Sequence, residues 1–282
     1  MRTATLTPRA SLESSRAMRV VALLATYNEE RFVGGCIEHL AVQGVETYLI
    51  DNESTDATVE IAGRFDLAGF ETAPRNNVYA WRPLLERKEA LAATLDADWF
   101  IHLDADEIRL PPHSSTTLAE AIAEVDALGY NAINFQELTF VPTVEAPDHD
   151  HPLFRETMRH YYAYLPSSPG RPDRLNAWRR QDSPVELAAS GGHQVSFAGI
   201  NVYPDSFPMR HYLCLSAAHA VSKYVERAYD PGEVESGWHR LRAALRAEGV
   251  TLLSQAELKE TRSDDDLDAS DPRSAHPLFG NS

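Results

Sequence analysis

The first 140 residues alternate short apolar runs with longer segments in which apolar residues recur every three or four positions. Uninterrupted runs of this kind predict buried strands, and the three-to-four spacing predicts amphipathic helices. From such runs, and from shorter or mixed stretches between the helical segments, we expect strands over residues 20–25, 47–50, 70–73, 99–103 and 132–140. A helical pattern follows each of the first four, and the last of these helices begins with a capping box formed by Thr117 and Glu120.

Strands that alternate with helices of crossover length predict an α/β fold, with a Rossmann-type, mostly parallel sheet and helices on both faces. Ligands bind such sheets beyond the carboxyl ends of the strands. Two acidic loops follow strands in this chain: the sequence DNESTD begins at Asp51, and the sequence DADE begins at Asp104. We therefore expect both loops to border the functional site.

The sequence pattern divides the chain into four segments. Residues 1–17 are expected to form a flexible N-terminal tail, and residues 18–140 form the α/β part. Residues 141–262 continue the same domain: their proline-rich beginning predicts a structured loop region that shapes a substrate pocket, and residues 209–246 read as helical. Residues 263–282 read as an acidic, flexible tail.

Composition limits the classes of partner. The 282 residues are 43% hydrophobic and 24% charged, which is typical of a globular protein with one main domain. A formal net charge of -16 argues against binding to nucleic acid or to an anionic membrane surface. An anionic substrate would therefore need local basic residues or a metal ion in its site.

Cysteine usage and apolar segments predict the compartment. The two cysteines, Cys36 and Cys214, suggest neither a disulfide framework nor a zinc ribbon. No apolar run has the length of a signal peptide or of a transmembrane segment. These features predict a cytoplasmic protein and leave open a peripheral attachment to the inner face of the membrane.

The DADE loop has the residue types of a divalent-cation site. In an extended segment, the side chains of Asp104 and Asp106 leave the same face, with Cα atoms about 7 Å apart. Two converging carboxylates favour Mg²⁺ or Mn²⁺. The pair D-x-D alone is a weak signal, since such residues also cap segments or form salt bridges. Its position directly after a buried strand favours the cation site.

The first predicted turn argues against a dinucleotide-binding protein or a P-loop protein. Both classes need a glycine-rich turn, so that the backbone can approach phosphate groups closely. Here the turn reads ATYNEERFV and has no glycine before Gly34. Any phosphates in the site must therefore be held by a metal ion and by side chains.

Three stretches, VVALLATYNEERFVGGCIEHL, YLIDNESTDATVEIA and ERKEALAATLDADWFIHLDADE, occur in this order along residues 19–107. Together they resemble the pattern of glycosyltransferase family 2, whose members have the GT-A fold, and residues 108–140 follow the pattern loosely. The resemblance implies an enzyme that moves a sugar from a nucleotide-diphosphate sugar, either a UDP-sugar or a GDP-sugar, to an acceptor hydroxyl. Transfer would invert the anomeric centre with help from Mn²⁺ or Mg²⁺, and the acceptor would be a carbohydrate, a lipid or a small molecule.

The same resemblance implies which residues contact the donor. The residues that border the base and ribose would be Ala25, Thr26, Tyr27 and Glu29, and Tyr27 would stack on the base. Asp51 would accept hydrogen bonds from the base, beside Asn52.

The donor's diphosphate would lie near a basic residue and the acidic loop. Lys88 stands where the family usually carries an arginine near the donor, and the adjacent Arg87 could serve instead. Asp104 would contact the ribose or the metal, and Asp106 would bind the metal that bridges the diphosphate.

An inverting transfer also needs a general base for the acceptor hydroxyl. Some family members have a His-Glu pair where this chain has His193 and Gln194, so a carboxylate is missing there. The predicted candidates are Glu186, which shortly precedes this segment, and then Glu137 and Asp173. His193 could bind the metal or contact the diphosphate.

The missing carboxylate keeps a second function open, that of a catalytically silent nucleotide-sugar-binding or scaffold protein. A nucleotidyltransferase on a related sheet is less favoured, because the first turn lacks the glycine-rich loop with which such enzymes usually begin.

Overall fold

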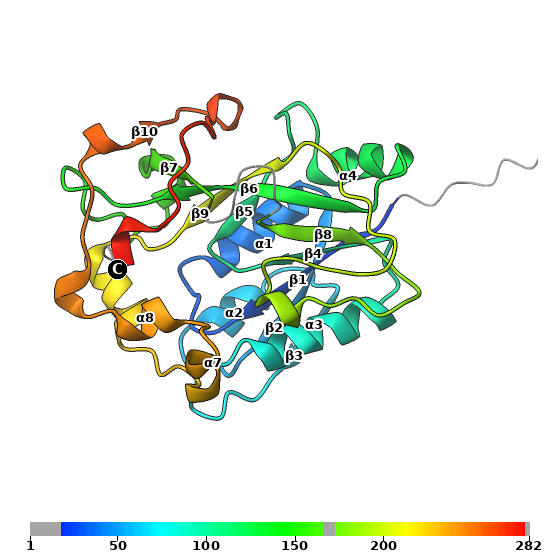
Figure 1. The fold of residues 1–282 in the computed structure, drawn as a ribbon, viewed down its shortest axis with the longest axis horizontal. Coiled ribbons are helices and arrows are strands. Elements are labelled where there is room, and N and C mark those ends of the chain that lie inside the picture. The colour runs from blue at the N-terminus through cyan, green and yellow to red at the C-terminus, as the bar shows by residue number, and fades with distance from the viewer. Residues whose placement is uncertain (1–17, 166–172, 280–282) are drawn as a thin grey trace, which may run out of the picture.

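A computed structural model describes residues 18–165 and 173–279, so the tail predicted at 1–17 lies outside the described residues. Strands of one large sheet run through the molecule in the order β10-β7-β6-β8-β4-β1-β2-β3, and β5 and β9 join it beside β6 (Figure 1). Within the described ranges, no helix combines the length and the apolarity needed to cross a lipid bilayer.

The first half of the sheet is parallel, as the sequence predicts. Its strands are β1 (Val20–Thr26), β2 (Val45–Asp51), β3 (Gly69–Thr72) and β4 (Trp99–Leu103). The helices that connect or follow them are α1 (Val33–Val42), α2 (Thr58–Ala62), α3 (Arg82–Thr94) and α4 (Leu118–Ala127). The capping box at the start of α4 is also present: Thr117 accepts from the Glu120 amide, and the Glu120 carboxylate accepts from the Thr117 amide.

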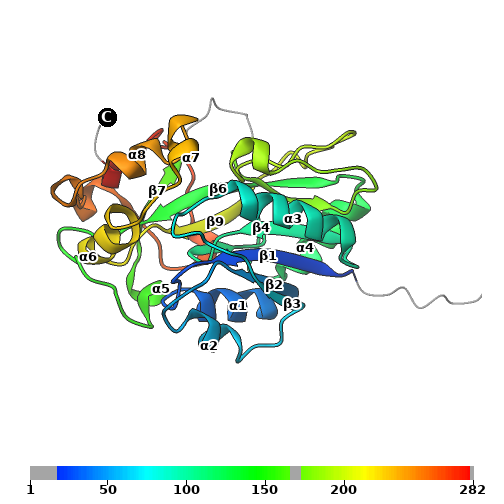
Figure 2. The same cartoon turned by 90° about the horizontal axis from the view of Figure 1, so that it is seen from below.

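Helices cover both faces of this parallel half because successive residues of a strand point to opposite sides. Val20, Ala22 and Leu24 of β1 pack in one core cluster with α1 and α4. Val21 and Leu23 pack on the other face with the apolar residues of α3. Figure 2 shows α1 and α2 on one side of β1 and α3 on the other. The predicted α/β fold with helices on both faces is confirmed, and it is the GT-A type of arrangement.

The second half of the sheet mixes strand directions. Its strands are β5 (Glu107–Arg109), β6 (Ala132–Phe140), β7 (His160–Tyr164), β8 (Leu175–Arg179), β9 (Phe207–Tyr212) and β10 (Lys259–Glu260). Strand β8 lies antiparallel between β4 and β6, and β9 runs parallel to β6. The segment predicted as a loop region therefore supplies β7 and β8 to the sheet, together with the short helix α5 (Phe154–Thr157).

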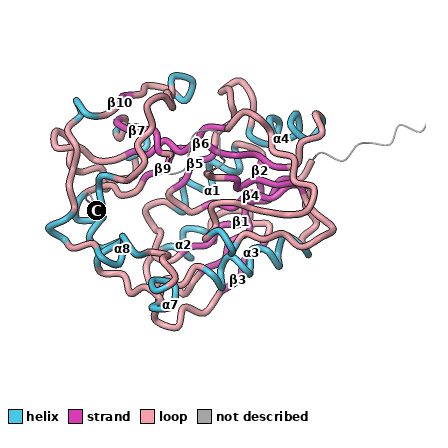
Figure 3. The backbone as a smooth tube through the Cα atoms, in the orientation of Figure 1, coloured by secondary structure: helices cyan, strands magenta, loops and turns pink. Residues whose placement is uncertain are grey.

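The prediction of helix from residue 209 is wrong for its first residues. Met209–Tyr212 belongs to β9, where Phe207, Met209 and His211 are buried on one face, and Met209 and His211 pair with β5 on one edge and β6 on the other. Only short helices, separated by loops, follow in the rest of this region (Figure 3). They are α6 (Ala217–Ala220), a π-helical turn η2 (Val221–Val225), α7 (Pro231–Glu235) and α8 (Arg240–Ala244).

The described part of the acidic C-terminal segment is held against the sheet, whereas the sequence suggests a flexible tail. The backbone of Arg273 exchanges hydrogen bonds with β7 and the residue after it, and the His276 ring stacks on Tyr164 with 3.8 Å between centroids. Leu278 is buried in a small core cluster beside Tyr162. These few contacts anchor a segment whose composition is otherwise polar.

Candidate functional site

A pocket opens where the parallel strands end. Thr26 at the end of β1 pairs with Asp51 of β2, and Leu24 pairs with Leu103 of β4, so the loops after these strands meet at one edge. The residues from these loops that line the pocket are Ala25, Thr26, Tyr27, Glu29, Asn52, Asp104, Ala105 and Asp106. The structure therefore brings together most of the residues that the family resemblance implies.

The loops after β1 and β2 are fastened to each other. Asn28 adopts a left-handed conformation with φ of 55°, and its amide donates to the Ser54 hydroxyl at 2.9 Å. The Asn28 side-chain oxygen accepts from the Thr55 amide at 2.8 Å. Asp51 stabilises the same turn by accepting from the Ser54 amide at 3.0 Å. Asp51 is thus buried beneath the pocket, and it is not among the described residues that line it.

The ring of Tyr27 is already in contact with another side chain, that of Arg75. The guanidinium carbon of Arg75 lies 3.3 Å from the ring centroid, a cation–π contact that covers one face of the ring. Arg75 also donates to the Asn52 side-chain oxygen at 3.3 Å. A base that stacks on Tyr27 would therefore use the opposite face or displace Arg75, which the sequence did not predict.

Of the two adjacent basic residues on α3, one faces the pocket. Lys88 is buried and lines it, with its ammonium 2.7 Å from His102 Nδ1 and 3.3 Å from the Leu103 carbonyl oxygen. Burial lowers the pKa of Lys88 to about 8. Arg87 points away and forms an ion pair with Glu71 at 2.6 Å, outside this pocket.

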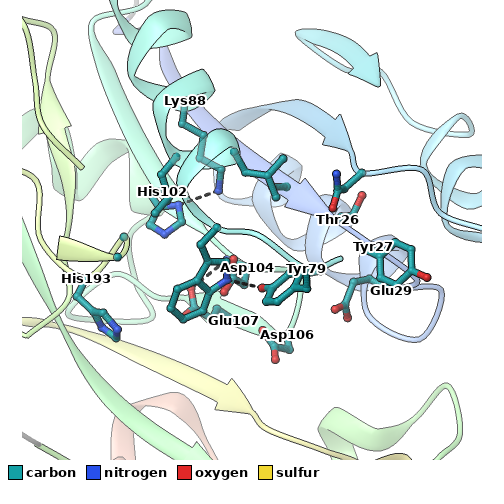
Figure 4. Close-up of a pocket in the computed structure, with 18 of the residues that line it drawn as sticks. Thr26, Tyr27, Glu29, Tyr79, Lys88, His102, Asp104, Asp106, Glu107 and His193 are labelled. Atoms are coloured by element: carbon teal, nitrogen blue, oxygen red, sulfur yellow. Dashed lines mark hydrogen bonds between the residues drawn. The ribbon is translucent and has the colours of Figure 1, made fainter. Parts of the chain in front are cut away.

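The aspartates of the DADE loop have different surroundings, although both line the pocket (Figure 4). Asp106 Oδ2 lies 2.5 Å from Lys223 Nζ and 3.5 Å from His211 Nε2. Burial alone would raise the pKa of Asp106, but these two neighbours hold it well below its usual range. The Asp104 carboxylate has no ion-pair partner among the described residues.

This arrangement does not fit the predicted metal site. Lys223 is paired with one oxygen of Asp106, Oδ2, and His211 faces the same oxygen. Arg174 donates to His193 Nδ1, which removes that nitrogen as a ligand. Among residues 18–165 and 173–279, no three His, Cys, Asp or Glu side chains are grouped as metal ligands. Asp104, Asp106 and His193 therefore do not form one ligand set here.

None of the three predicted base candidates is among the described residues that line the pocket. Glu137 is buried with both oxygens occupied: Oε2 accepts from Arg174 at 2.9 Å, and Oε1 lies 2.6 Å from His211 Nδ1. Despite burial, these neighbours hold the pKa of Glu137 well below its usual range. Asp173 is buried beside β6, and Glu186 is exposed where its backbone pairs with Ser196.

Glu29 is a carboxylate of the pocket with an unusual pKa. Burial raises this pKa to about 7, although the nearby charge of Lys223 lowers it. Its backbone amide donates to Thr58 at 2.7 Å, which fixes the loop but leaves the carboxylate facing the pocket.

A network of alternating charge that the sequence did not predict runs along the wall of the pocket. It links Lys223, Asp106, His211, Glu137, Arg174 and His193 through successive contacts. Burial alone would lower the pKa of His211, but the carboxylates of Glu137 and Asp106 raise it to about 10. The charge of Arg174, together with burial, lowers the pKa of His193 to about 3. His193 is therefore neutral, and because Nδ1 accepts from Arg174, its Nε2–H is available as a donor.

Basic side chains concentrate in this pocket although the whole chain is acidic. Those that line its described part are Lys88, Arg174, Lys223, Arg227 and Arg242. Three of them come from the segment after β9. The sequence shows that these residues are basic, but no spacing pattern in it predicts that they face the pocket. The local basic residues that an anionic substrate requires are present.

Glycines let the loop before His193 approach the pocket wall. Gly192 has φ of 85°, and a Cβ there would lie 2.8 Å from His102 Nε2 and 3.0 Å from Leu85. We expect Gly192→Ala to reduce the free energy of unfolding by about 1–3 kcal/mol, measured by urea denaturation. Gly129→Ala is the matched control, since Gly129 has φ of 86° and no atom within 4 Å of the added Cβ. Equal losses in both variants would show that the contact with His102 is unimportant.

The fold and the pocket define an α/β protein of the GT-A type with its ligand site at the carboxyl edge of the sheet. Residues 22–161 match the model described as glycosyl transferase family 2, and the chain belongs to this family. No curated protein matches the chain.

Two solved structures are similar over part of their length. A mycobacterial protein has 19% sequence identity and a TM-score of 0.30, and the alignment covers 43% of this chain and 41% of that one. The mannosyltransferase PcManGT from Pyrobaculum calidifontis, solved with GDP-Man and Mn²⁺, has 15% identity and a TM-score of 0.41. That alignment covers 79% of this chain and 68% of the mannosyltransferase.

Proposed function

We propose that this chain transfers a sugar from a UDP-sugar or a GDP-sugar to a hydroxyl group of a carbohydrate, lipid or small-molecule acceptor, with inversion. The observation that carries the proposal is the pocket itself. It joins the loops after β1, β2 and β4 to a concentration of basic side chains in an otherwise acidic protein. A nucleoside diphosphate is a negatively charged leaving group, which suits these basic side chains.

The basic side chains supply what the reaction needs at the donor. Breaking the bond between sugar and phosphate develops negative charge on the diphosphate, and preorganised cations stabilise that charge in a partly buried site. The Nε2–H of His193 adds a neutral donor for a phosphate or sugar oxygen. The loops after β1 and β2 would hold the nucleoside beside Tyr27 and Asn52.

We propose that the general base is one of the carboxylates that line the pocket, and not Glu137, Asp173 or Glu186. Glu29 and Asp104 line the pocket, and neither carboxylate has an ion-pair partner among the described residues. A general base works best when its pKa lies near the working pH, and the pKa of Glu29, about 7, meets this condition. Replacing the true base by its amide slows transfer but preserves donor binding.

A catalytically silent nucleotide-sugar-binding protein is the second candidate. Two observations favour it: Gln194 stands where some relatives have a carboxylate, and the three base candidates predicted from the sequence lie outside the lining of the pocket. Such a protein would bind nucleoside diphosphates and leave the bond between sugar and phosphate intact.

Release of nucleoside diphosphate from a panel of UDP- and GDP-sugars separates these candidates. We expect slow release even without acceptor, and we expect Asp104→Asn to reduce its rate by roughly 10- to 100-fold, the effect of losing one charged hydrogen bond. Asp66→Asn, on an exposed position far from the pocket, is the control and should be unchanged. Nucleotide binding without any release would favour the silent binder.

The stereochemistry of the product tests the mechanism. Proton NMR of the first-formed product should give the anomeric configuration opposite to that of the donor. A retained configuration would rule out a single displacement by an acceptor hydroxyl.

A further inference from the structure

The ammonium group of Lys223 lies where the family resemblance implies a metal ion. It projects from the π-helical turn η2 and reaches Asp106 at 2.5 Å, and both side chains are buried. Its charge also lies 4.9 Å from the ring centroid of Phe32 and 5.6 Å from that of Tyr224. Lys223 is therefore held at Asp106 by surroundings that suit a cation.

Asp106 would have to release Lys223 before it could bind a divalent cation, and the surroundings of Asp106 oppose this release. Removing one partner of a buried ion pair leaves an uncompensated charge and is strongly unfavourable. His211 Nε2 lies 3.5 Å from the same carboxylate oxygen, and Glu137 Oε1 lies 2.6 Å from His211 Nδ1, so this ring is held beside Asp106. A divalent cation would have to displace the Lys223 ammonium group and fit beside the His211 ring.

Lys223 and Arg227 stand at the junction of two cavities. The pocket described above adjoins a second cavity of about 680 Å³, and Tyr27, Glu29, Lys223 and Arg227 line both. The guanidinium of Arg227 lies 4.4 Å from the ring centroid of Tyr79 and has no ion pair with a carboxylate in the described part of the chain. A diphosphate at this junction would meet both cations and leave the nucleoside beside Tyr27, which lines both cavities.

We propose that Lys223, together with Arg227, takes the place of the divalent cation, so that the diphosphate of the donor is bound by side-chain cations without a metal ion. The inference rests on the proposed function, because it assigns the charge partner of the same donor. Lys223 remains paired with Asp106 on one side and presents its other N–H groups to phosphate oxygens.

Calorimetric titration of UDP and GDP into the full-length protein tests this inference, once with EDTA and once with Mn²⁺. We expect dissociation constants that agree within about threefold, because the cations are part of the chain. Binding that occurs only with Mn²⁺ would overturn the inference and leave the proposed function intact. If neither nucleotide binds under either condition, the proposed function itself fails.

Single-residue variants test whether Lys223 and Arg227 are the cations that bind the nucleotide. In EDTA, Lys223→Met should weaken nucleotide binding by roughly tenfold or more, whereas Lys223→Arg should retain most of it. Lys259→Met is the matched control, since it removes another lysine–aspartate pair, with Asp268, away from the pocket. Arg227→Gln leaves the pair between Lys223 and Asp106 intact, so its expected loss of roughly tenfold does not depend on how well Lys223→Met folds. Unchanged affinity in both Lys223→Met and Arg227→Gln would overturn the inference.

Discussion

Replacing Arg174 by leucine is expected to reduce the free energy of unfolding by about 3–5 kcal/mol, because it leaves the buried carboxylate of Glu137 without its main partner. Glu137 is 1% exposed, and Arg174 reaches it through two nitrogens, the Nε at 2.9 Å and an Nη at 2.5 Å. Equilibrium unfolding in urea at neutral pH measures the loss. The variant should also free the Nδ1 atom of His193, which accepts from Arg174 in the wild type.

Two controls separate the buried charge from a general effect of substitution. The double variant Glu137→Leu/Arg174→Leu should recover part of the stability, because it removes both charges together. Arg64→Leu breaks the exposed pair with Glu60 and should cost no more than about 1 kcal/mol. If Arg174→Leu costs as little as Arg64→Leu, the charge network along the pocket wall does not contribute to stability as we infer.

The parallel half of the sheet could be predicted because its signals are local. Apolar runs indicate β1 and β4 most clearly, and apolar spacing indicates the helices, as in Val33, Cys36, Ile37 and Leu40 of α1. The capping box at Thr117 involves residues three positions apart, so the sequence alone specifies it. Positions at the carboxyl ends of these strands follow directly from the order of strands and helices.

The partners of the DADE loop could not be predicted, because they come from distant segments. Lys223 lies 117 positions after Asp106 in the chain, and no spacing rule links the two residues. His211 stands in a stretch rich in apolar residues that suits a helix as well as a strand. Pairing with β5 on one edge and β6 on the other decides that it forms β9, and places His211 between Asp106 and Glu137.

The choice between a metal ion and a lysine at Asp106 also lies beyond the sequence pattern. A carboxylate at the end of a buried strand needs a positively charged partner, so the sequence pattern predicts that Asp106 has one. Whether a dissolved ion or a side chain meets this need depends on the path of the chain after β9, where short helices alternate with loops (Figure 3). Glu186 is near in sequence to His193, but its backbone pairs with Ser196, and it is not among the described residues that line the pocket.

The charge on His211 should make stability depend on pH. The pKa of His211 is raised from 6.5 to about 10 by Glu137 and Asp106, so the ionised form is the stabilising one. Its contribution is fully present below pH 6.5 and is lost as the pH rises through about 10. A shift of this size corresponds to stabilisation on the order of 3–5 kcal/mol.

Comparison with His211→Gln isolates this contribution, because other groups titrate in the same range. The pKa of Lys88, lowered to about 8 by burial, works in the opposite direction above that pH, since the unfolded chain then binds the additional proton. Both effects are present in the wild type, but only the contribution of Lys88 remains in His211→Gln. The difference in unfolding free energy between the two proteins should therefore be several kcal/mol at pH 6 and should shrink steadily towards pH 10. His113→Gln, at an exposed position, should differ little from the wild type at any pH.

The contradicting result would be a difference between wild type and His211→Gln that stays constant from pH 6 to pH 10. It would mean that His211 is uncharged in the folded protein and that Asp106 relies on Lys223 alone.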